Sequence, residues 1–211
     1  MQKHVSDSTV RRLSHYLRAL ESFELEGPFT VSSEELAQRG GTTAAQVRKD
    51  LSHFGSFGKR GLGYGVPKLA AKLRGILGLD RRWRVALVGA GRIGSALFAY
   101  PDFKLRGFDV VAVLDSNPAK VGECWGDVKV TSSDLLEEVI GGLGIELVIL
   151  AIPAEAVQEV ADRAIAAGVH GILNFAPRQV RVPPHVHLKH VNLVMELEAL
   201  SFAIGQDGSK A

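Results

Sequence analysis

A glycine-rich stretch in the middle of the chain constrains the fold more than any other feature. Residues 84–100 read RVALVGAGRIGSALFAY, an apolar run followed by Gly89, Gly91 and Gly94 and then by a helix-like segment. A G-x-G-x-x-G spacing between a strand and a helix is typical of a loop that binds the phosphates of a dinucleotide. The stretch therefore predicts the start of a nucleotide-binding domain.

Strand-like and helix-like segments continue to alternate after this loop. FDVVAVLD, ELVILAIP and HGILNF read as strands, KVTS leads into the helix-like SSDLLEEVI, and AEAVQEVADRAIAAG reads as a long helix. Such alternation predicts a parallel sheet with helices on both faces. We therefore expect an α/β fold with a Rossmann-type domain.

The three glycines have different expected roles. Gly89 permits the tight turn, Gly91 lets the backbone approach a pyrophosphate, and Gly94 allows the helix to pack closely on the strand. The free N–H groups at the helix start, together with the helix dipole, would hold the phosphates. Arg92 can add a charged contact.

An acidic residue follows at the distance that a dinucleotide site requires. Asp115 ends the second strand, 21 residues after Gly94. A carboxylate there accepts hydrogen bonds from the ribose hydroxyls and repels a 2′-phosphate, which favours NADH and NAD⁺ over their phosphorylated forms. Lys120 acts against this preference. A CoA-binding or sugar-nucleotide domain of the same architecture remains an alternative.

The charge is unevenly distributed along the chain. Residues 1–84 hold 15 Lys or Arg and 8 Asp or Glu, a net charge of +7, whereas residues 85–211 have a net charge of −5. A basic N-terminal part joined to an acidic C-terminal part suggests that the first part meets a polyanion such as nucleic acid.

Three helices are expected in this basic part. An amphipathic helix runs from Ser8 to the stop signal at Gly27-Pro28. Two helices separated by Gly40-Gly41 follow. Each begins with the spacing of a capping box, which is Ser32 with Glu35 in the first and Thr43 with Gln46 in the second. The positions expected to be buried are Val10, Leu13, Leu17 and Leu20 in the long helix and Ala44, Val47, Leu51 and Phe54 in the last.

This layout is that of a helix-turn-helix, whose second helix enters the major groove of DNA. The glycine-punctuated segment GSFGKRGLGYGVPK predicts a basic hairpin, or wing, that neutralises phosphates or enters a narrow minor groove. Tyr64 can pack on the sugar-phosphate edge or on its own domain. A small helical domain that binds protein or mediates oligomers is the alternative. The expected DNA-contacting residues are Thr42, Thr43, Gln46, Arg48, Lys49, Ser52, Lys59, Arg60 and Tyr64.

The remainder of the chain leaves little room for enzyme chemistry. Only 36 residues follow Phe175, too few for the substrate domain of a dehydrogenase. His185, His187 and His190 have a spacing that can bind a metal, but on a strand-like segment it equally places solvated side chains. We expect neither a metal site nor a catalytic residue. A small NAD-dependent oxidoreductase with an accessory domain is the rival interpretation.

The C-terminal segment from Asn192 to Ile204 is more apolar than a solvated terminal helix should be. A second copy of the chain would bury it, and a symmetric dimer suits a palindromic DNA site. We expect a DNA-binding domain over 1–80, a Rossmann domain over 81–191 and a dimerisation helix over 192–211.

No targeting or disulfide signal changes this outline. The single cysteine, Cys124, rules out an intrachain disulfide, and we take it as a plain side chain. No apolar run approaches the ~18 residues of a membrane span. The N-terminus lacks a signal-peptide core. We therefore expect a cytoplasmic protein.

Together these segments resemble the Rex family, bacterial transcriptional repressors that sense NADH and NAD⁺. The resemblance spans nearly the whole chain and is carried by VSSEELAQRGGTTAAQVRKDLSHFGSFGKRGLGYGV, VGAGRIGSAL, LAIPAEAVQ, GILNFAP and HVNLVMELEAL. It implies a homodimer with swapped C-terminal helices that represses genes of respiration and fermentative NADH re-oxidation. It also implies that NAD⁺ permits operator binding and that NADH releases the protein from operator DNA.

The resemblance also implies site residues. Arg12 and Tyr100 match a switch network between the two domains, whose third member is commonly an Asp. Here that position is Asn192, whose uncharged amide cannot form the same ion pair with Arg12. Phe202 is expected to reach the partner's nicotinamide pocket. The segment 175–177 would lie near the nicotinamide. The expected cofactor-binding residues are Gly89, Ala90, Gly91, Arg92, Ile93, Gly94, Asp115, Ala151, Ile152, Pro153, Phe175, Ala176 and Pro177.

Overall fold

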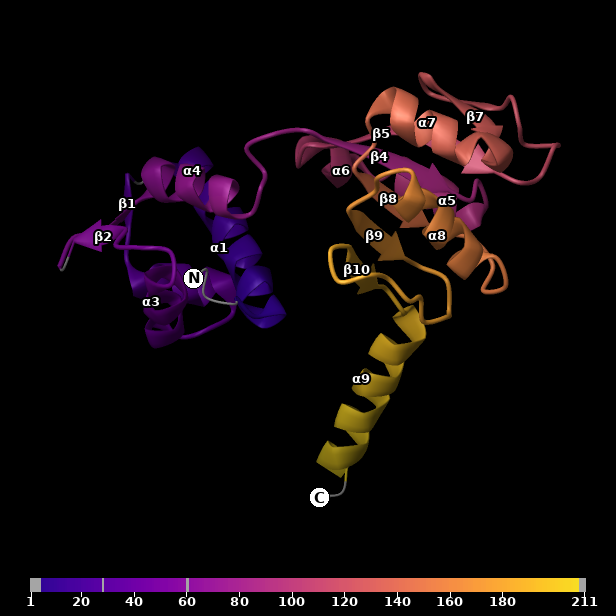
Figure 1. Ribbon diagram of the computed structural model, residues 1–211. Helices are drawn as coiled ribbons and strands as arrows, with labels where there is room; N and C mark the ends of the chain where they lie inside the picture. The colour runs from indigo at the N-terminus through magenta and orange to yellow at the C-terminus, as the bar shows by residue number, and fades with distance from the viewer. Residues whose placement is uncertain (1–4, 28, 60, 209–211) are drawn as a thin grey trace. The chain divides into compact units, whose positions relative to one another are not determined.

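The computed structural model divides the chain into two compact units, residues 1–81 and residues 82–211 (Figure 1). It describes residues 5–27, 29–59 and 61–208. Two residues of the sequence predictions, Pro28 and Arg60, lie outside the described residues, and so does the side chain of Lys59.

The first unit combines a helical core with a small antiparallel sheet of order β1-β3-β2. Helix α1 packs against α2 and α4, and α2 packs against α3. This is the predicted helix-turn-helix followed by a hairpin. The elements are α1 (Asp7–Glu26), β1 (Thr30–Val31), α2 (Ser33–Gly40), α3 (Ala44–Ser52), β2 (Gly58–Lys59), β3 (Gly63–Gly65) and α4 (Val66–Ile76).

Helix α1 begins and ends at recognisable caps. The Ser6 hydroxyl accepts a hydrogen bond from the Thr9 N–H, and Gly27 ends the helix in the left-handed conformation. The predicted buried stripe is wrong at Val10, which is 41% exposed, whereas Thr9 is buried. The helix therefore turns its polar Thr9 inward, where the hydroxyl accepts a hydrogen bond from Arg12.

Of the two predicted capping boxes, the first is complete and the second is half formed. At the start of α2, Ser32 and Glu35 form both reciprocal hydrogen bonds, as predicted. At the start of α3, the Thr43 hydroxyl accepts from the Gln46 N–H, but the Gln46 side chain does not return to Thr43. It donates instead to Asp50, at 2.7 Å. The second box is therefore only half formed, because a carboxylate one turn ahead is the stronger acceptor.

The second unit is built on a seven-stranded sheet of order β10-β9-β8-β4-β5-β7-β6 (Figure 1). All neighbours run parallel except β6, which is antiparallel to β7. The strand order reverses between β4 and β8, and ligands of doubly wound sheets bind at such a point. The strands are β4 (Trp83–Val88), β5 (Phe108–Asp115), β6 (Cys124–Trp125), β7 (Val128–Ser132), β8 (Leu147–Leu150), β9 (Gly171–Asn174) and β10 (His187–His190).

Alternating side chains of the strands build a core on each face of this sheet. Ala86 and Val88 face helices α7 (Leu136–Leu143) and α8 (Val157–Ala166). Val85 and Leu87 face the opposite side, where α5 (Arg92–Phe98) and α6 (Pro101–Leu105) pack. The expected α/β class with a parallel sheet is confirmed. The expected helix over 154–168 is wrong at its start, since α8 begins only at Val157.

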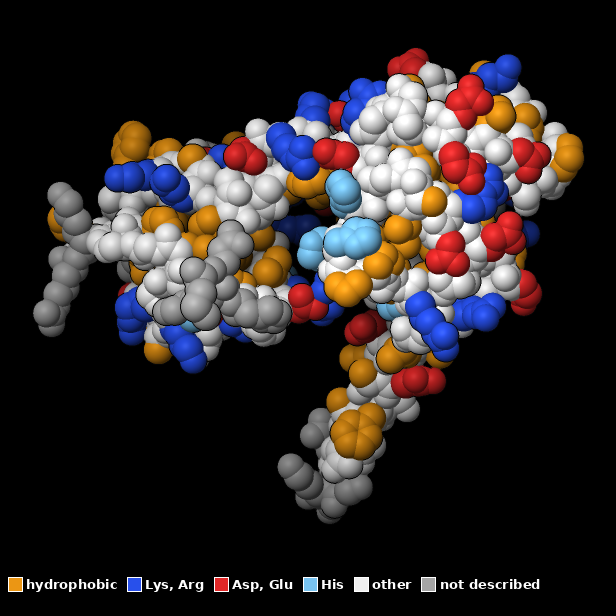
Figure 2. Space-filling view, in the orientation of Figure 1, with side chains coloured by type: hydrophobic (Ala, Val, Ile, Leu, Met, Phe, Trp, Pro, Cys, Tyr) orange, Lys and Arg blue, Asp and Glu red, His pale blue; other side chains and the backbone are white. Residues whose placement is uncertain are grey.

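The last helix, α9 (Leu193–Gly208), extends away from the sheet (yellow in Figure 1). Its side chains are exposed from Leu193 to Gln206, and hydrophobic groups cover much of it in Figure 2. Among the residues that the structure describes, no helix is both long enough and apolar enough to cross a bilayer.

Candidate functional site

Helix α3 presents a polar, basic surface to solvent. Thr43 caps the helix, and Arg48, Lys49 and Ser52 are exposed along it. Val47 and Leu51 are buried on the opposite side, as predicted. The exposed side chains match the expected DNA-contacting face, whose contacts with DNA stay a prediction.

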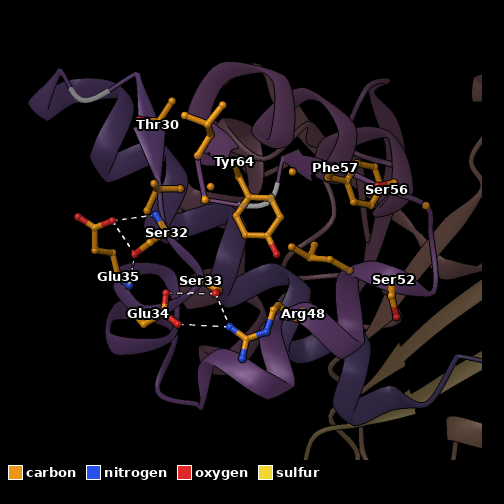
Figure 3. Close-up of a pocket in the computed structure, with 17 residues that line it drawn as sticks. Thr30, Ser32, Ser33, Glu34, Glu35, Arg48, Ser52, Ser56, Phe57 and Tyr64 are labelled. Carbon is orange, nitrogen blue, oxygen red and sulfur yellow. Dashed lines mark hydrogen bonds and ion pairs between the residues drawn. The ribbon is translucent and has the colours of Figure 1, made fainter.

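Arg48 is held in place by the start of α2. Its Nη1 donates to the Ser33 hydroxyl at 2.7 Å and to Glu34 Oε1 at 3.3 Å (Figure 3). These contacts border a pocket of about 780 Å³ between the hairpin, α2 and α3. The Tyr64 ring packs against the core of the unit, while its hydroxyl points into this pocket (Figure 3). The guanidinium is therefore bonded to residues of its own unit, and its contact with DNA stays a prediction.

A buried carboxylate on α3 joins this helix to α1. Asp50 is 1% exposed and accepts hydrogen bonds on both oxygens. Arg12 approaches Oδ2 through Nε at 2.6 Å and Oδ1 through Nη2 at 2.8 Å. The Tyr16 hydroxyl donates to Oδ2 at 2.9 Å, and Gln46 donates to Oδ1. The ion pair is bidentate, and each carboxylate oxygen of Asp50 accepts from two donors.

This network shifts the acid–base properties of its members. Burial alone would raise the pKa of Asp50, but the hydrogen bonds from Arg12, Gln46 and Tyr16 outweigh it and lower the pKa. Burial and the hydrogen bond to Asp50 raise the pKa of Tyr16 to about 12. Asp50 is therefore an anion in the folded protein, and Tyr16 is a neutral donor.

Sequence reasoning did not find Asp50, although a signal was present. Asp50 lies three positions after Val47 and four before Phe54, on the face predicted to be buried. An acid on an apolar face requires a donor, because an unpaired buried charge is strongly unfavourable. The donor, Arg12, lies 38 positions away, and no local pattern indicates it.

The glycine loop has the geometry that a dinucleotide site needs. Gly89 has a φ of +104°, and a Cβ there would overlap the carbonyl group of Ala151. A Cβ on Gly94 would overlap the carbonyl oxygen of Gly89, so α5 packs directly on the loop. A Cβ on Gly91 would meet nothing within 4 Å. The loop is thus crowded where it packs and open where a pyrophosphate would approach.

Asp115 supports this loop from the end of β5. Its Oδ2 accepts from the Ala90 N–H at 2.7 Å, and its Oδ1 accepts from the Asn117 N–H at 2.8 Å. Lys120 Nζ lies 3.5 Å from Oδ2. A carboxylate has about four lone-pair positions, so Asp115 retains acceptor capacity for ribose hydroxyls. The predicted ribose contact remains a prediction.

The other expected cofactor residues follow the neighbouring strands. The segment 151–153 follows β8, and the segment 175–177 follows β9. The Phe175 N–H donates to the Leu150 carbonyl at 2.9 Å, which keeps the ends of the two strands together. Arg92 and Ile93 begin α5 and are exposed. These expected residues therefore gather at the carboxyl ends of β4, β5, β8 and β9.

The predicted switch and dimer residues occupy separate places. Arg12 belongs to the Asp50 network of the first unit. Tyr100 stacks edge-on against Phe103, with ring centres 5.3 Å apart. The Asn192 Oδ1 accepts from the Val194 and Met195 N–H groups and caps α9. Phe202 is 70% exposed on α9. A switch network that joins Arg12 and Tyr100 stays a prediction.

The three histidines of the C-terminal motif do not converge. Within the ranges 5–27, 29–59 and 61–208, no three His, Cys, Asp or Glu side chains are grouped as metal ligands. His185 and His187 are exposed, whereas His190 Nδ1 lies 3.0 Å from Asn174 Nδ2.

Two family models match the chain. The model described as "CoA binding domain" matches residues 80–178, and the model described as "Putative DNA-binding protein N-terminus" matches residues 4–52. The first matched segment contains the glycine loop and Asp115, and the second contains α1, α2 and α3. The two matches therefore fall on the two candidate sites.

Curated relatives match along nearly the full length. The chain is 46% identical over 203 residues to the redox-sensing transcriptional repressor Rex of Carboxydothermus hydrogenoformans, covering 96% of this chain and 98% of the relative. It is 44% identical to the protein of the same name from Pelotomaculum thermopropionicum, covering 98% of this chain and 97% of the relative.

Solved structures agree with these relatives. The fold matches a crystal structure of RSP in complex with β-NAD⁺ and operator DNA, with a TM-score of 0.93 and 37% identity, covering 98% of this chain and 95% of the other. It also matches RSP in complex with β-NADH, with a TM-score of 0.86 and 36% identity, covering 97% and 96% of the two chains.

Proposed function

Because the chain belongs to the Rex family of redox-sensing transcriptional repressors, we propose that it binds operator DNA and leaves it when NADH replaces NAD⁺. One observation carries the proposal. The chain joins a basic helix-turn-helix unit to a dinucleotide-type sheet, and this pair matches RSP, a Rex-family repressor that was solved with NAD⁺ and operator DNA.

In this proposal the dinucleotide is the signal and not the reagent of an enzyme. Gly89, Gly91 and Gly94 would hold the pyrophosphate, and Asp115 would hold the ribose. The backbone at Gly91 is open to such a ligand, since a Cβ there would meet nothing within 4 Å. The remaining contacts would come from Ala90, Arg92, Ile93, Ala151, Ile152, Pro153, Phe175, Ala176 and Pro177.

A second copy of the chain would complete the molecule. One face of the sheet carries an apolar pocket of about 450 Å³ lined by side chains of β8 and β9, Phe103 and Phe108. Helix α9 exposes an apolar surface of its own, including Leu197, Leu200 and Phe202. Both surfaces are costly in water, and exchange of α9 between two protomers would cover them. A dimer would present two α3 helices to a palindromic operator in the bacterial cytoplasm.

The redox response follows from differential affinity. The oxidised nicotinamide ring carries a positive charge and the reduced ring does not, so an apolar pocket formed by Ala176, Pro177 and the partner's Phe202 favours NADH. A ligand shifts an equilibrium only by its different affinities for the two states. Half-sites on DNA recur every ~34–36 Å, so a small change in dimer closure disrupts the double contact.

The test is a titration of the protein bound to an operator fragment that has been selected from genomic DNA. We expect saturating NADH to lower operator affinity at least about tenfold, within the usual range of allosteric coupling, and NAD⁺ to leave it nearly unchanged. Fluorescence anisotropy of labelled DNA measures both. Equal effects of the two dinucleotides would contradict the proposal, and CoA or hydride-transfer activity would favour the alternatives.

Removal of the basic side chains of α3 should weaken DNA binding without changing the binding of NADH. We expect Arg48→Ala and Lys49→Ala to lower operator affinity about 5- to 100-fold, because each removes a contact to a base edge or a phosphate. NADH affinity should not change. Lys72→Ala is the matched control, since Lys72 is an exposed cation on α4. Wild-type operator affinity of both α3 variants would refute the assignment of the recognition helix.

A further inference from the structure

The ends of β9 and β10 connect two functional segments. The two strands are parallel, and Asn174 of β9 is the register partner of His190 of β10. Beyond Asn174 the chain enters the segment 175–177, which we propose lies near the nicotinamide. Beyond His190 it enters α9, which begins at Leu193. Adjacent strand ends therefore lead to the ligand and to the proposed dimer helix.

The Asn174 side chain bonds to both of these segments. It is 0% exposed, and its Oδ1 accepts from the Ala176 N–H at 2.9 Å. Its Nδ2 donates to the Arg178 carbonyl at 2.9 Å and meets His190 Nδ1 at 3.0 Å. An amide nitrogen only donates, so His190 Nδ1 is the acceptor in this contact.

Hydrogen bonds also hold the chain between this pair and α9. The Val191 N–H donates to the Asn174 carbonyl at 2.9 Å. The Asn192 side chain then caps the first turn of α9. Asn174 thus bonds to the backbone of Ala176 on one side and to His190 and Val191 on the other, and the chain continues from Val191 through Asn192 into α9. A displacement at the nicotinamide end would be transmitted along these contacts.

We propose that the Asn174–His190 hydrogen bond couples the dinucleotide site to α9, and that His190 is a positioning residue. The contact is required for NADH to release operator DNA but not for NADH to bind. The inference rests on the proposed function. Coupling between distant sites needs a physical element that both sites can bias, and the paired ends of β9 and β10 contact both the segment 175–177 and the start of α9.

Of the three histidines in the motif, only His190 is suited to this role. Within the part of the chain that the structure describes, the ring of His185 makes no hydrogen bond, and His187 lines the apolar pocket of the sheet. His190 is itself exposed, so water can reach Asn174 after its removal and the fold should persist.

The experiment compares His190→Ala with His190→Asn and with the control His185→Ala. For each protein, operator affinity is measured by anisotropy without ligand and with saturating NADH, and NADH affinity is measured by its fluorescence. We expect the wild-type ratio of operator affinities to be at least about ten and the ratio for His190→Ala to fall below about three. Asparagine places an acceptor near the position of Nδ1, so His190→Asn should retain the wild-type ratio.

Three results would overturn the inference. One is a wild-type ratio in His190→Ala. A second is a fall in the NADH affinity of His190→Ala, or in its operator affinity without ligand, that is as large as the fall in its ratio of operator affinities. A merely structural role of His190 predicts such a result. A third is a loss in His185→Ala as large as that in His190→Ala. If the wild-type protein itself does not respond to NADH, the proposed function fails and the inference fails with it.

Discussion

Replacement of Gly91 by alanine should lower NADH affinity by about 10- to 100-fold and leave the protein folded, since hydrogen bonds to a charged group contribute about 1.5–3 kcal/mol. Nothing lies within 4 Å of a Cβ at this position, and its φ of −80° suits alanine. The added methyl group would instead occupy the space through which a pyrophosphate approaches the backbone. NADH fluorescence and thermal unfolding measure the two effects separately.

Two other glycines serve as controls for this prediction. Gly94→Ala should lower both NADH affinity and thermal stability, because its Cβ would overlap the Gly89 carbonyl oxygen. Gly141→Ala on α7 should leave NADH affinity unchanged and raise stability by about 0.4–1 kcal/mol, since its Cβ would also meet nothing within 4 Å. NADH affinity of Gly91→Ala equal to that of Gly141→Ala would show that the dinucleotide does not lie on this loop.

The second large effect is expected from Asp50→Asn, which should lower the stability of the DNA-binding unit by about 3–5 kcal/mol. The substitution keeps the shape of the side chain but leaves the Arg12 guanidinium without its anion. It also places an amide nitrogen, a donor, among the Tyr16 and Gln46 donors. Hydrogen exchange of the α1 and α3 amides in the full chain reports the free energy of opening of this unit.

Glu34→Gln is the matched control, because it removes the carboxylate of another ion pair to the same helix. The side chains of Arg48 and Glu34 are 55% and 69% exposed, and such surface pairs contribute about 0–1 kcal/mol. A similar loss of stability in both variants would contradict the distinction between a buried and an exposed pair.

The loss of stability caused by Asp50→Asn should also depend on pH. Its pKa is lowered in the folded state, so the carboxylate stabilises the fold above the unfolded-state pKa. This contribution falls as pH drops through the lowered folded-state pKa. The difference in stability between wild type and Asp50→Asn should therefore be full near neutral pH and shrink below about pH 4. A difference that is constant down to pH 2 would contradict this.

Much of the fold could be predicted from local patterns. The loop at Gly89, Gly91 and Gly94, the acid at the end of β5 and the cap at Ser32 each depend on residues close in sequence. Where a local prediction failed, the burial of a polar side chain was involved. Gln46 turned from its own cap to the carboxylate of Asp50, and Thr9 took the inward place expected for Val10.

By itself the sequence determined the two kinds of domain, their order along the chain and the loop that would hold a dinucleotide. Spacing and hydrophobic period report backbone geometry and burial, which are local properties. Only the tertiary structure decided which polar groups pair inside. Asp50 meets Arg12 across 38 positions and Asn174 meets His190 across 16, because packing of helices and strands brings them together. A buried polar group must find a partner wherever the fold supplies one, and its neighbours in sequence do not identify that partner.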